Sequence, residues 1–163
     1  MTRATLTDVL TPALAQGYAV AGVVCLGWED ARAYTRAAEL ERLPIILQAG
    51  PGARAHMPIS VWGAMFGELA ESVSVPVVSH LDHGTSLEDC AAAIAAGFSS
   101  VMFDGSALPL SQNIARTAEI AEMAHAAGAD PLEFRLAHAR DEWEPGAAVL
   151  DAVREMSGWT GTT

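Results

Sequence analysis

The chain has 163 residues with 51% hydrophobic content, which is enough for one ordinary domain with a full core and argues against wholesale disorder. Its formal net charge of -11 repels phosphate backbones and anionic lipid, so neither nucleic acid nor a membrane surface is an expected partner. All nine basic residues are arginine, and the absence of lysine excludes Schiff-base catalysis by this chain.

The predicted elements alternate along the chain between helices and strands. Helices are predicted over residues 6–16, 28–43, 60–73, 87–97 and 113–127, and strands over residues 18–26, 46–48, 75–84 and 98–106. The segment between the second strand and the third helix is predicted as a turn because it is rich in glycine and proline. Strands recur about every thirty residues, the size of a right-handed βαβ unit, so the sheet should be parallel.

The pattern changes near residue 130. Two short helical segments, 132–140 and 147–156, follow there, and no further strand is predicted. We therefore divide the chain into a βα array over residues 1–129 and a C-terminal helical segment with a tail over residues 130–163. The fold class is α/β, with four parallel βα units equivalent to half of a TIM-type (β/α)8 barrel, plus C-terminal helices.

The cysteine spacing and the apolar segments indicate in which cellular compartment the protein is expected. The two thiols, Cys25 and Cys90, lie far apart without a CxxC spacing, so neither a disulfide framework nor a zinc–thiolate site is expected. The N-terminus lacks an uninterrupted apolar core for a signal peptide, and the apolar run over residues 19–26 is too short to span a bilayer. We expect a cytoplasmic protein.

The stretch VPVVSHLDHG, residues 75–84, is the strongest functional signal. A buried strand ends there in His80, Asp82 and His83, and ligands of parallel α/β folds bind beyond the carboxyl ends of the strands. Alternation along an extended strand places His80 and Asp82 on one face, and Leu81 and His83 on the other. A carboxylate beside an imidazole can serve as acid or base, and a neutral imidazole can ligate a metal. The alternative is that both histidines cap the strand and bond to the backbone.

Two motifs carry a family resemblance. HLDHG at residues 80–84 and AGFSSVMFDGS at residues 96–106 make the stretch from residue 75 to 128 resemble the third and fourth βα units of class II ketose-bisphosphate aldolases. LTPALAQGYAV and LPIILQAGPGA, residues 10–20 and 43–53, are similar to the opening elements of that family. The likeness covers residues 6–128 and identifies the chain as a member truncated to the N-terminal half.

The resemblance implies a function and roles for particular residues. These enzymes are (β/α)8 barrels that use zinc to cleave fructose or tagatose bisphosphate into dihydroxyacetone phosphate and an aldehyde. By motif match, Asp82 is the catalytic acid/base, His83 is a zinc ligand, and Asp104 lies near the metal. His80 is a supporting residue. Glycolysis, or carbohydrate metabolism more broadly, is the implied context.

The chain also departs from the family. Residues 23–27 are apolar where relatives carry an asparagine-rich stretch, and Gly50 replaces a serine that assists phosphate binding. The second half of the barrel, with a glutamate, two more zinc-ligating histidines and a glycine-rich phosphate loop, is expected to be missing. A catalytic zinc takes three protein ligands, and the match supplies one.

Several residues are weaker candidates for completing the site. His56 follows the second strand and is a candidate metal ligand, although an exposed loop histidine is the commoner situation. Arg54, in the same loop, is a candidate for phosphate binding. The positions of Gly50, Gly84 and Ser106 make them further candidates for substrate contacts.

Half a barrel leaves two open strand edges and an uncovered apolar face. A homodimer, a complementary aldolase-like chain, or the helices after residue 130 could cover them, or the sheet could flatten with helices on both sides. Two functions follow: a zinc-dependent aldolase acting on a sugar phosphate, or a non-catalytic binding or assembly subunit that pairs with another aldolase-like chain. Stoichiometric zinc distinguishes the two.

Overall fold

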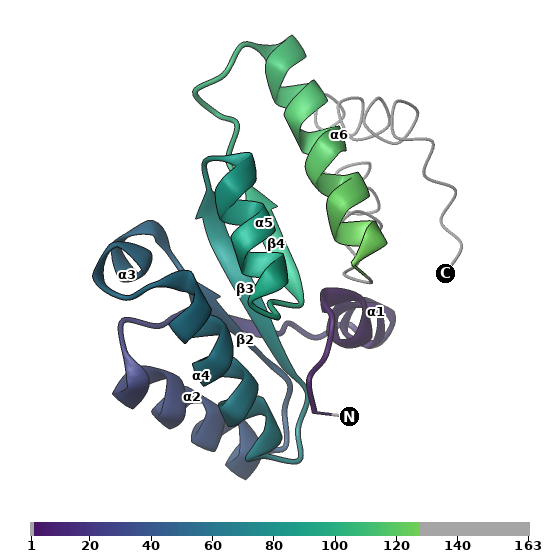
Figure 1. Ribbon diagram of the computed structural model, residues 1–163. Coiled ribbons are helices and arrows are strands. Elements are labelled where there is room, and N and C mark those ends of the chain that lie inside the picture. Colours follow the sequence, from purple (N-terminus) through teal and green to yellow (C-terminus); the bar gives the residue numbers. More distant parts are fainter. Residues whose placement is uncertain (1, 128–163) are drawn as a thin grey trace.

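Four parallel strands form the single sheet of the computed structural model, which describes residues 2–127 (Figure 1). They are β1 (Ala21–Val24), β2 (Ile45–Ala49), β3 (Val77–Gly84) and β4 (Ser100–Phe103), and they pair in chain order. The predicted parallel βα array is confirmed. The predicted C-terminal helices and the division after residue 129 lie outside the described residues.

One face of the sheet is covered by a layer of helices. These are α2 (Trp28–Glu41), α4 (Ile59–Glu71), α5 (Leu87–Ala95) and α6 (Leu110–Ala126), and each one contacts the next (Figure 1). The main core lies between this layer and the strands. Its largest buried side chains include Leu47, Trp62, Phe66 and Leu81, and the ring of Phe66 contacts those of Trp62 and Phe98. Among residues 2–127, no helix is long and apolar enough to cross a membrane.

The opposite face carries a smaller core under α1 (Leu6–Gln16). Thr5 caps this helix: its hydroxyl accepts a hydrogen bond from the Asp8 amide at 3.2 Å, and the Asp8 carboxylate accepts one from the Thr5 amide at 2.8 Å. Val9 of the helix packs with Ile46 and Val78 of the sheet. Because neighbouring residues of β2 and β3 enter the main core instead, the central strands are buried on both faces.

The structure contains one helix that was not predicted, α3 (Pro51–His56), in the segment interpreted as a turn. Gly50 is its N-cap and Pro51 is its first residue, a position that suits proline because the first helical N–H groups have no helical partner. The first strand is also shorter than predicted. The segment before Ala21 does not pair with β2, and the ladder between them covers four residues.

Helices α4 and α5 approach each other closely at a glycine. A Cβ atom added to Gly63 would overlap the carbonyl oxygen of Ala96, just after α5. That oxygen belongs to the backbone, so it cannot move aside as a flexible side chain would. The absence of a side chain at Gly63 therefore sets the spacing of these two helices.

We predict that Gly63→Ala lowers the free energy of unfolding by about 1–3 kcal/mol, because the new methyl group pushes α4 away from α5. Urea denaturation monitored by circular dichroism measures this change. Gly52→Ala, in helix α3, is the matched control, since a Cβ atom there meets nothing within 4 Å, and it should leave stability unchanged or raise it by up to about 1 kcal/mol. Equal effects of the two substitutions would contradict the packing argument.

Candidate functional site

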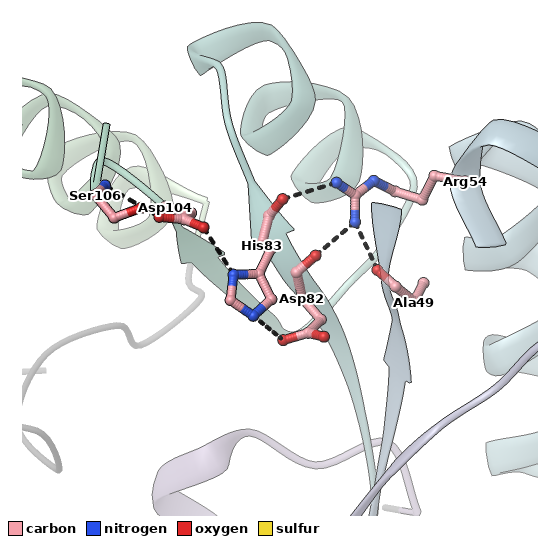
Figure 2. A network of polar contacts seen from close by, with 6 residues as sticks. All are labelled: Ala49, Arg54, Asp82, His83, Asp104 and Ser106. Atoms are coloured by element: carbon pink, nitrogen blue, oxygen red, sulfur yellow. Dashed lines mark hydrogen bonds and ion pairs between the residues drawn. The ribbon is translucent and has the colours of Figure 1, made fainter. Parts of the chain in front are cut away.

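A polar cluster lies where β2, β3 and β4 end (Figure 2). The His83 Nδ1 atom is 2.8 Å from Oδ2 of Asp104, and its Nε2 atom is 3.9 Å from Oδ1 of Asp82. The Asp82 side chain is 18% exposed and that of His83 is 49% exposed. The site thus combines a mostly buried carboxylate with an imidazole that solvent or a ligand can reach. Asp82, His83 and Asp104, three residues singled out from the sequence, are brought together.

A bulge near the end of β3 produces this arrangement. Leu81 pairs with Val101 and Gly84 with Phe103, so three steps along β3 oppose two steps along β4. His83 has φ of +51°, in the left-handed region that residues other than glycine rarely adopt. The alternation predicted from the sequence, with Asp82 and His83 on opposite faces, is therefore wrong at His83. The extra residue turns the imidazole toward both carboxylates.

Arg54, from the unpredicted helix α3, holds the backbone at the same place (Figure 2). Its Nη1 group donates to the carbonyl oxygens of Ala49 at 2.7 Å and Asp82 at 2.6 Å, and Nη2 donates to that of His83 at 2.9 Å. From the sequence, Arg54 was expected to bind phosphate or to be simply solvated, and this backbone contact was not predicted. The one available signal was the Gly50-Pro51 pair, which is compatible with a helix start.

The charges of the cluster reinforce one another. The hydrogen bond to Asp104, followed by the negative charge of Asp82, raises the pKa of His83 above its ordinary value. Hydrogen bonds from Ser106 and His83 lower the pKa of Asp104 to about 2. An ionised carboxylate only accepts hydrogen bonds, so the Nδ1 atom of His83 carries a hydrogen and donates it to Asp104. When the ring is neutral, its Nε2 lone pair is then directed away from Asp104 and can bind a metal or a proton.

Glycines leave room around the cluster. A Cβ atom on Gly50 would lie 3.6 Å from Oδ2 of Asp82, so even a small side chain there would contact this carboxylate. At Gly84 a Cβ atom would press on the side chains of Leu81 and Cys90, so this position is fixed by packing. Gly50 therefore borders the candidate site, whereas Gly84 borders the core.

His80 lies apart from this cluster. It is 6% exposed, and its Nδ1 atom is 2.7 Å from the hydroxyl of Ser100 on β4. Ser106 contributes through its backbone amide, which donates to Oδ1 of Asp104 at 3.0 Å. His56 is the last residue of α3. Within residues 2–127, neither His56 nor another side chain joins the cluster to make a group of three His, Cys, Asp or Glu residues able to hold a metal ion.

The donors around His83 do not by themselves fit the catalytic zinc that the sequence suggests. A catalytic zinc takes three protein ligands, and residues 2–127 contain no group of three His, Cys, Asp or Glu side chains placed so that they could hold a metal ion. The thiols do not help, because burial raises the pKa of Cys25 to about 12 and that of Cys90 to about 11. Residues 2–127 therefore do not form a complete zinc site, although His83, with Nδ1 bonded to a carboxylate, has the arrangement usual for one zinc ligand.

Comparisons with known proteins give a consistent picture. The sequence profile of the family fructose-bisphosphate aldolase class-II matches residues 4–141. A probable fructose-bisphosphate aldolase of Bacillus subtilis is 44% identical over 123 residues, covering 74% of this chain and 43% of that protein. A fructose-bisphosphate aldolase of Streptococcus pyogenes serotype M3 is 43% identical over 115 residues, covering 69% of this chain and 39% of that protein. The chain thus spans less than half the length of these two relatives.

Solved structures agree in fold. The YdjI aldolase of Escherichia coli K12 superposes with a TM-score of 0.74 at 29% identity, covering 79% of this chain and 50% of that one. The fructose-bisphosphate aldolase of Campylobacter jejuni superposes with a TM-score of 0.72 at 20% identity, covering 94% of this chain and 53% of that one. At this lower identity the second comparison bears on the fold alone.

We predict that Asp104→Asn lowers the pKa of His83 toward its ordinary value of 6.5, because the main cause of the rise is removed. A histidine NMR titration of chelator-treated protein measures this change. The raised pKa of His83 stabilises the fold fully below pH 6.5, and this contribution is lost as the pH rises through the folded value. The lowered pKa of Asp104 stabilises the fold fully above pH 3.8, and this contribution is lost as the pH falls toward about 2.

The stability difference between wild type and Asp104→Asn should therefore be largest between about pH 4 and 6.5. Asp8→Asn, in the helix cap of α1, is the control for removing a carboxylate elsewhere and should leave the titration of His83 unchanged. A His83 titration that is the same in wild type and Asp104→Asn would contradict the assignment.

Proposed function

The chain belongs to the class II fructose-bisphosphate aldolase family, and from this premise we propose that it takes part in zinc-dependent aldol cleavage of a ketose bisphosphate. The products would be dihydroxyacetone phosphate and an aldehyde. The observation that best supports this proposal is the strand-end cluster, in which Asp82 stands beside an imidazole whose Nδ1 atom is bound by Asp104. The absence of lysine agrees with it, because the iminium route to the same cleavage needs an amine.

The roles follow from what each group can do. Asp82, whose side chain is mostly buried, accepts the proton of the substrate hydroxyl next to the breaking carbon–carbon bond and returns it in the reverse direction. His83 offers Nε2 as a zinc ligand, and Asp104 fixes the ring and its tautomer. Zinc held in part by His83 would supply a Lewis acid for the substrate ketone. Gly50 leaves space beside Asp82, and the region around Ser106 is a proposed contact for the sugar phosphate.

The remaining zinc ligands must come from outside residues 2–127, because the described part of the chain does not group three donors. We propose that a second chain, either a copy of this one or a complementary aldolase-like chain, provides or completes them. β1 is an edge strand with a half-exposed Val24, and an apolar groove of about 300 Å³ lies between β1 and α2. An edge that pairs with no other strand among residues 2–127, beside an apolar groove, suits such a partner. The same proposal places the protein in the cytoplasm and in carbohydrate metabolism.

The incomplete donor set also favours a second function, that of a non-catalytic binding or assembly subunit paired with an aldolase-like chain. The two functions differ in what they require of Asp82. A catalytic chain depends on this carboxylate, whereas an assembly subunit does not.

We predict that Asp82→Asn lowers the rate of fructose or tagatose bisphosphate cleavage by about 10²–10⁴-fold, the usual contribution of a general acid or base. A coupled assay of dihydroxyacetone phosphate, with zinc and any copurifying partner present, measures the rate. Glu119→Gln, an exposed carboxylate on α6, is the control and should keep full activity. Cleavage by Asp82→Asn at the wild-type rate would overturn the catalytic role, and an inactive wild type would favour the assembly subunit.

Native mass spectrometry after incubation with zinc chloride should give an even oligomer with about one zinc per chain, because a complete site needs donors from more than residues 2–127. Chelator treatment should remove the zinc, and His83→Ala should prevent its binding. A zinc-free monomer, before and after incubation, would contradict both the zinc and the homodimer proposals. An even oligomer without zinc would keep the assembly role and reject the catalytic one.

A further inference from the structure

Two consecutive backbone carbonyls of β3 converge on one guanidinium. Those of Asp82 and His83 lie 2.6 and 2.9 Å from the Nη atoms of Arg54 (Figure 2). From this convergence we infer that Arg54 is a positioning residue, which holds the end of β3 in its left-handed conformation and thereby sets the places of the Asp82 and His83 side chains. It acts through the backbone and need not touch substrate or metal.

The backbone carbonyls of Asp82 and His83 point to the same side of the strand, which a regular strand does not allow. In an extended strand, successive carbonyl groups point to opposite sides, toward the two neighbouring strands. A single guanidinium can then reach only one of two consecutive carbonyls. Here it reaches both, because φ of +51° at His83 turns that carbonyl to the same side as the one before it. The contact with Arg54 and the unusual backbone of His83 therefore support each other.

Arg54 is itself held in place by the core. Trp62, fully buried in α4, donates from its indole nitrogen to the Ala53 carbonyl at 3.2 Å and fixes helix α3. The third contact of Arg54 is with the Ala49 carbonyl at the end of β2. The guanidinium thus joins the ends of two strands, and a change of backbone at His83 would break its contacts with β3.

Arginine suits this role better than lysine. Its planar fork presents several N–H groups in fixed directions, so Nη1 and Nη2 serve three carbonyls at once. A lysine ammonium is a single point on a flexible stem, and it could satisfy only part of this set. Substitution by lysine should therefore preserve the conformation in part, and substitution by methionine should not.

The first test is the backbone of His83 in metal-free protein. We expect Arg54→Met to move the ¹³Cα chemical shift of His83 toward the value of an extended strand, and Arg54→Lys to give an intermediate shift. Arg116→Met, which removes an exposed arginine of α6, is the matched control and should leave the shift unchanged. A wild-type His83 shift in folded Arg54→Met would overturn the inference, even if that variant were less stable.

A double-mutant cycle can distinguish two explanations of the Arg54 contacts. Either Arg54 supports the left-handed backbone of His83, or it only fastens helix α3 to the strand ends. Glycine adopts positive φ without strain, so in a His83→Gly background the left-handed conformation no longer needs support. Arg54→Met should then lower the folding equilibrium constant about fivefold less than it does with histidine at position 83. Equal losses in the two backgrounds would mean that Arg54 only attaches α3. If Arg54→Met alone does not fold, folding of the double variant supports the inference, and its failure to fold opposes it.

The positioning role of Arg54 does not depend on the proposed function. One consequence does depend on it, namely that Arg54 affects the affinity of the site for zinc. With zinc chloride as the probe, we expect Arg54→Met to bind about 10–100-fold more weakly than wild type, as when groups supporting a metal ligand are removed. Wild type that binds no zinc would count against the proposed function and leave the NMR result standing. Unchanged affinity in a variant whose His83 has moved would show that the backbone conformation does not govern the metal site.

Discussion

The extra residue near the end of β3 is the constraint on which the candidate site depends. A regular strand would direct His83 to the same face as Leu81, into the helix layer. The bulge and the left-handed backbone instead direct the imidazole toward Asp82 and Asp104. Such a conformation costs free energy, so it persists only where neighbouring groups favour it. Arg54 donates hydrogen bonds to the backbone carbonyls of Asp82 and His83, and Asp104 hydrogen-bonds to the imidazole ring of His83.

This dependence connects the site to the core through a short series of contacts. Trp62 belongs to the aromatic cluster under the helix layer, yet its indole nitrogen holds α3 by the Ala53 carbonyl. α3 in turn carries Arg54 to the strand ends. A substitution that loosens the packing around Trp62 would therefore reach the strand-end cluster without any direct contact with it. The site and the core cannot be treated as independent parts of this chain.

Much of this could be predicted from the sequence, because it follows from local patterns. Apolar runs spaced by about thirty residues predicted the parallel sheet, and the resemblance to the aldolase family implied that Asp104 would lie near the metal position of His83. The bulge could not be predicted, because alternation with period two is the only rule for a strand whose pairing is unknown. Helix α3 was not predicted because the sequence Gly50-Pro51-Gly52 is typical of a turn. Since Arg54 acts from that helix on that bulge, its contacts could not be foreseen either.

The strand-end cluster is also independent of the open edge of the sheet. Its hydrogen bonds join residues from the ends of β2, β3 and β4 and from α3, and none of those described here involves β1. A partner that covers β1 would add donors or close the sheet, but the arrangement of Asp82, His83 and Asp104 already exists without it. The arrangement of these three side chains is therefore a property of this chain, and under the proposed function further metal ligands would come from beyond residues 2–127. If the positioning role inferred for Arg54 holds, the placement of these groups depends on contacts within this chain rather than on a partner.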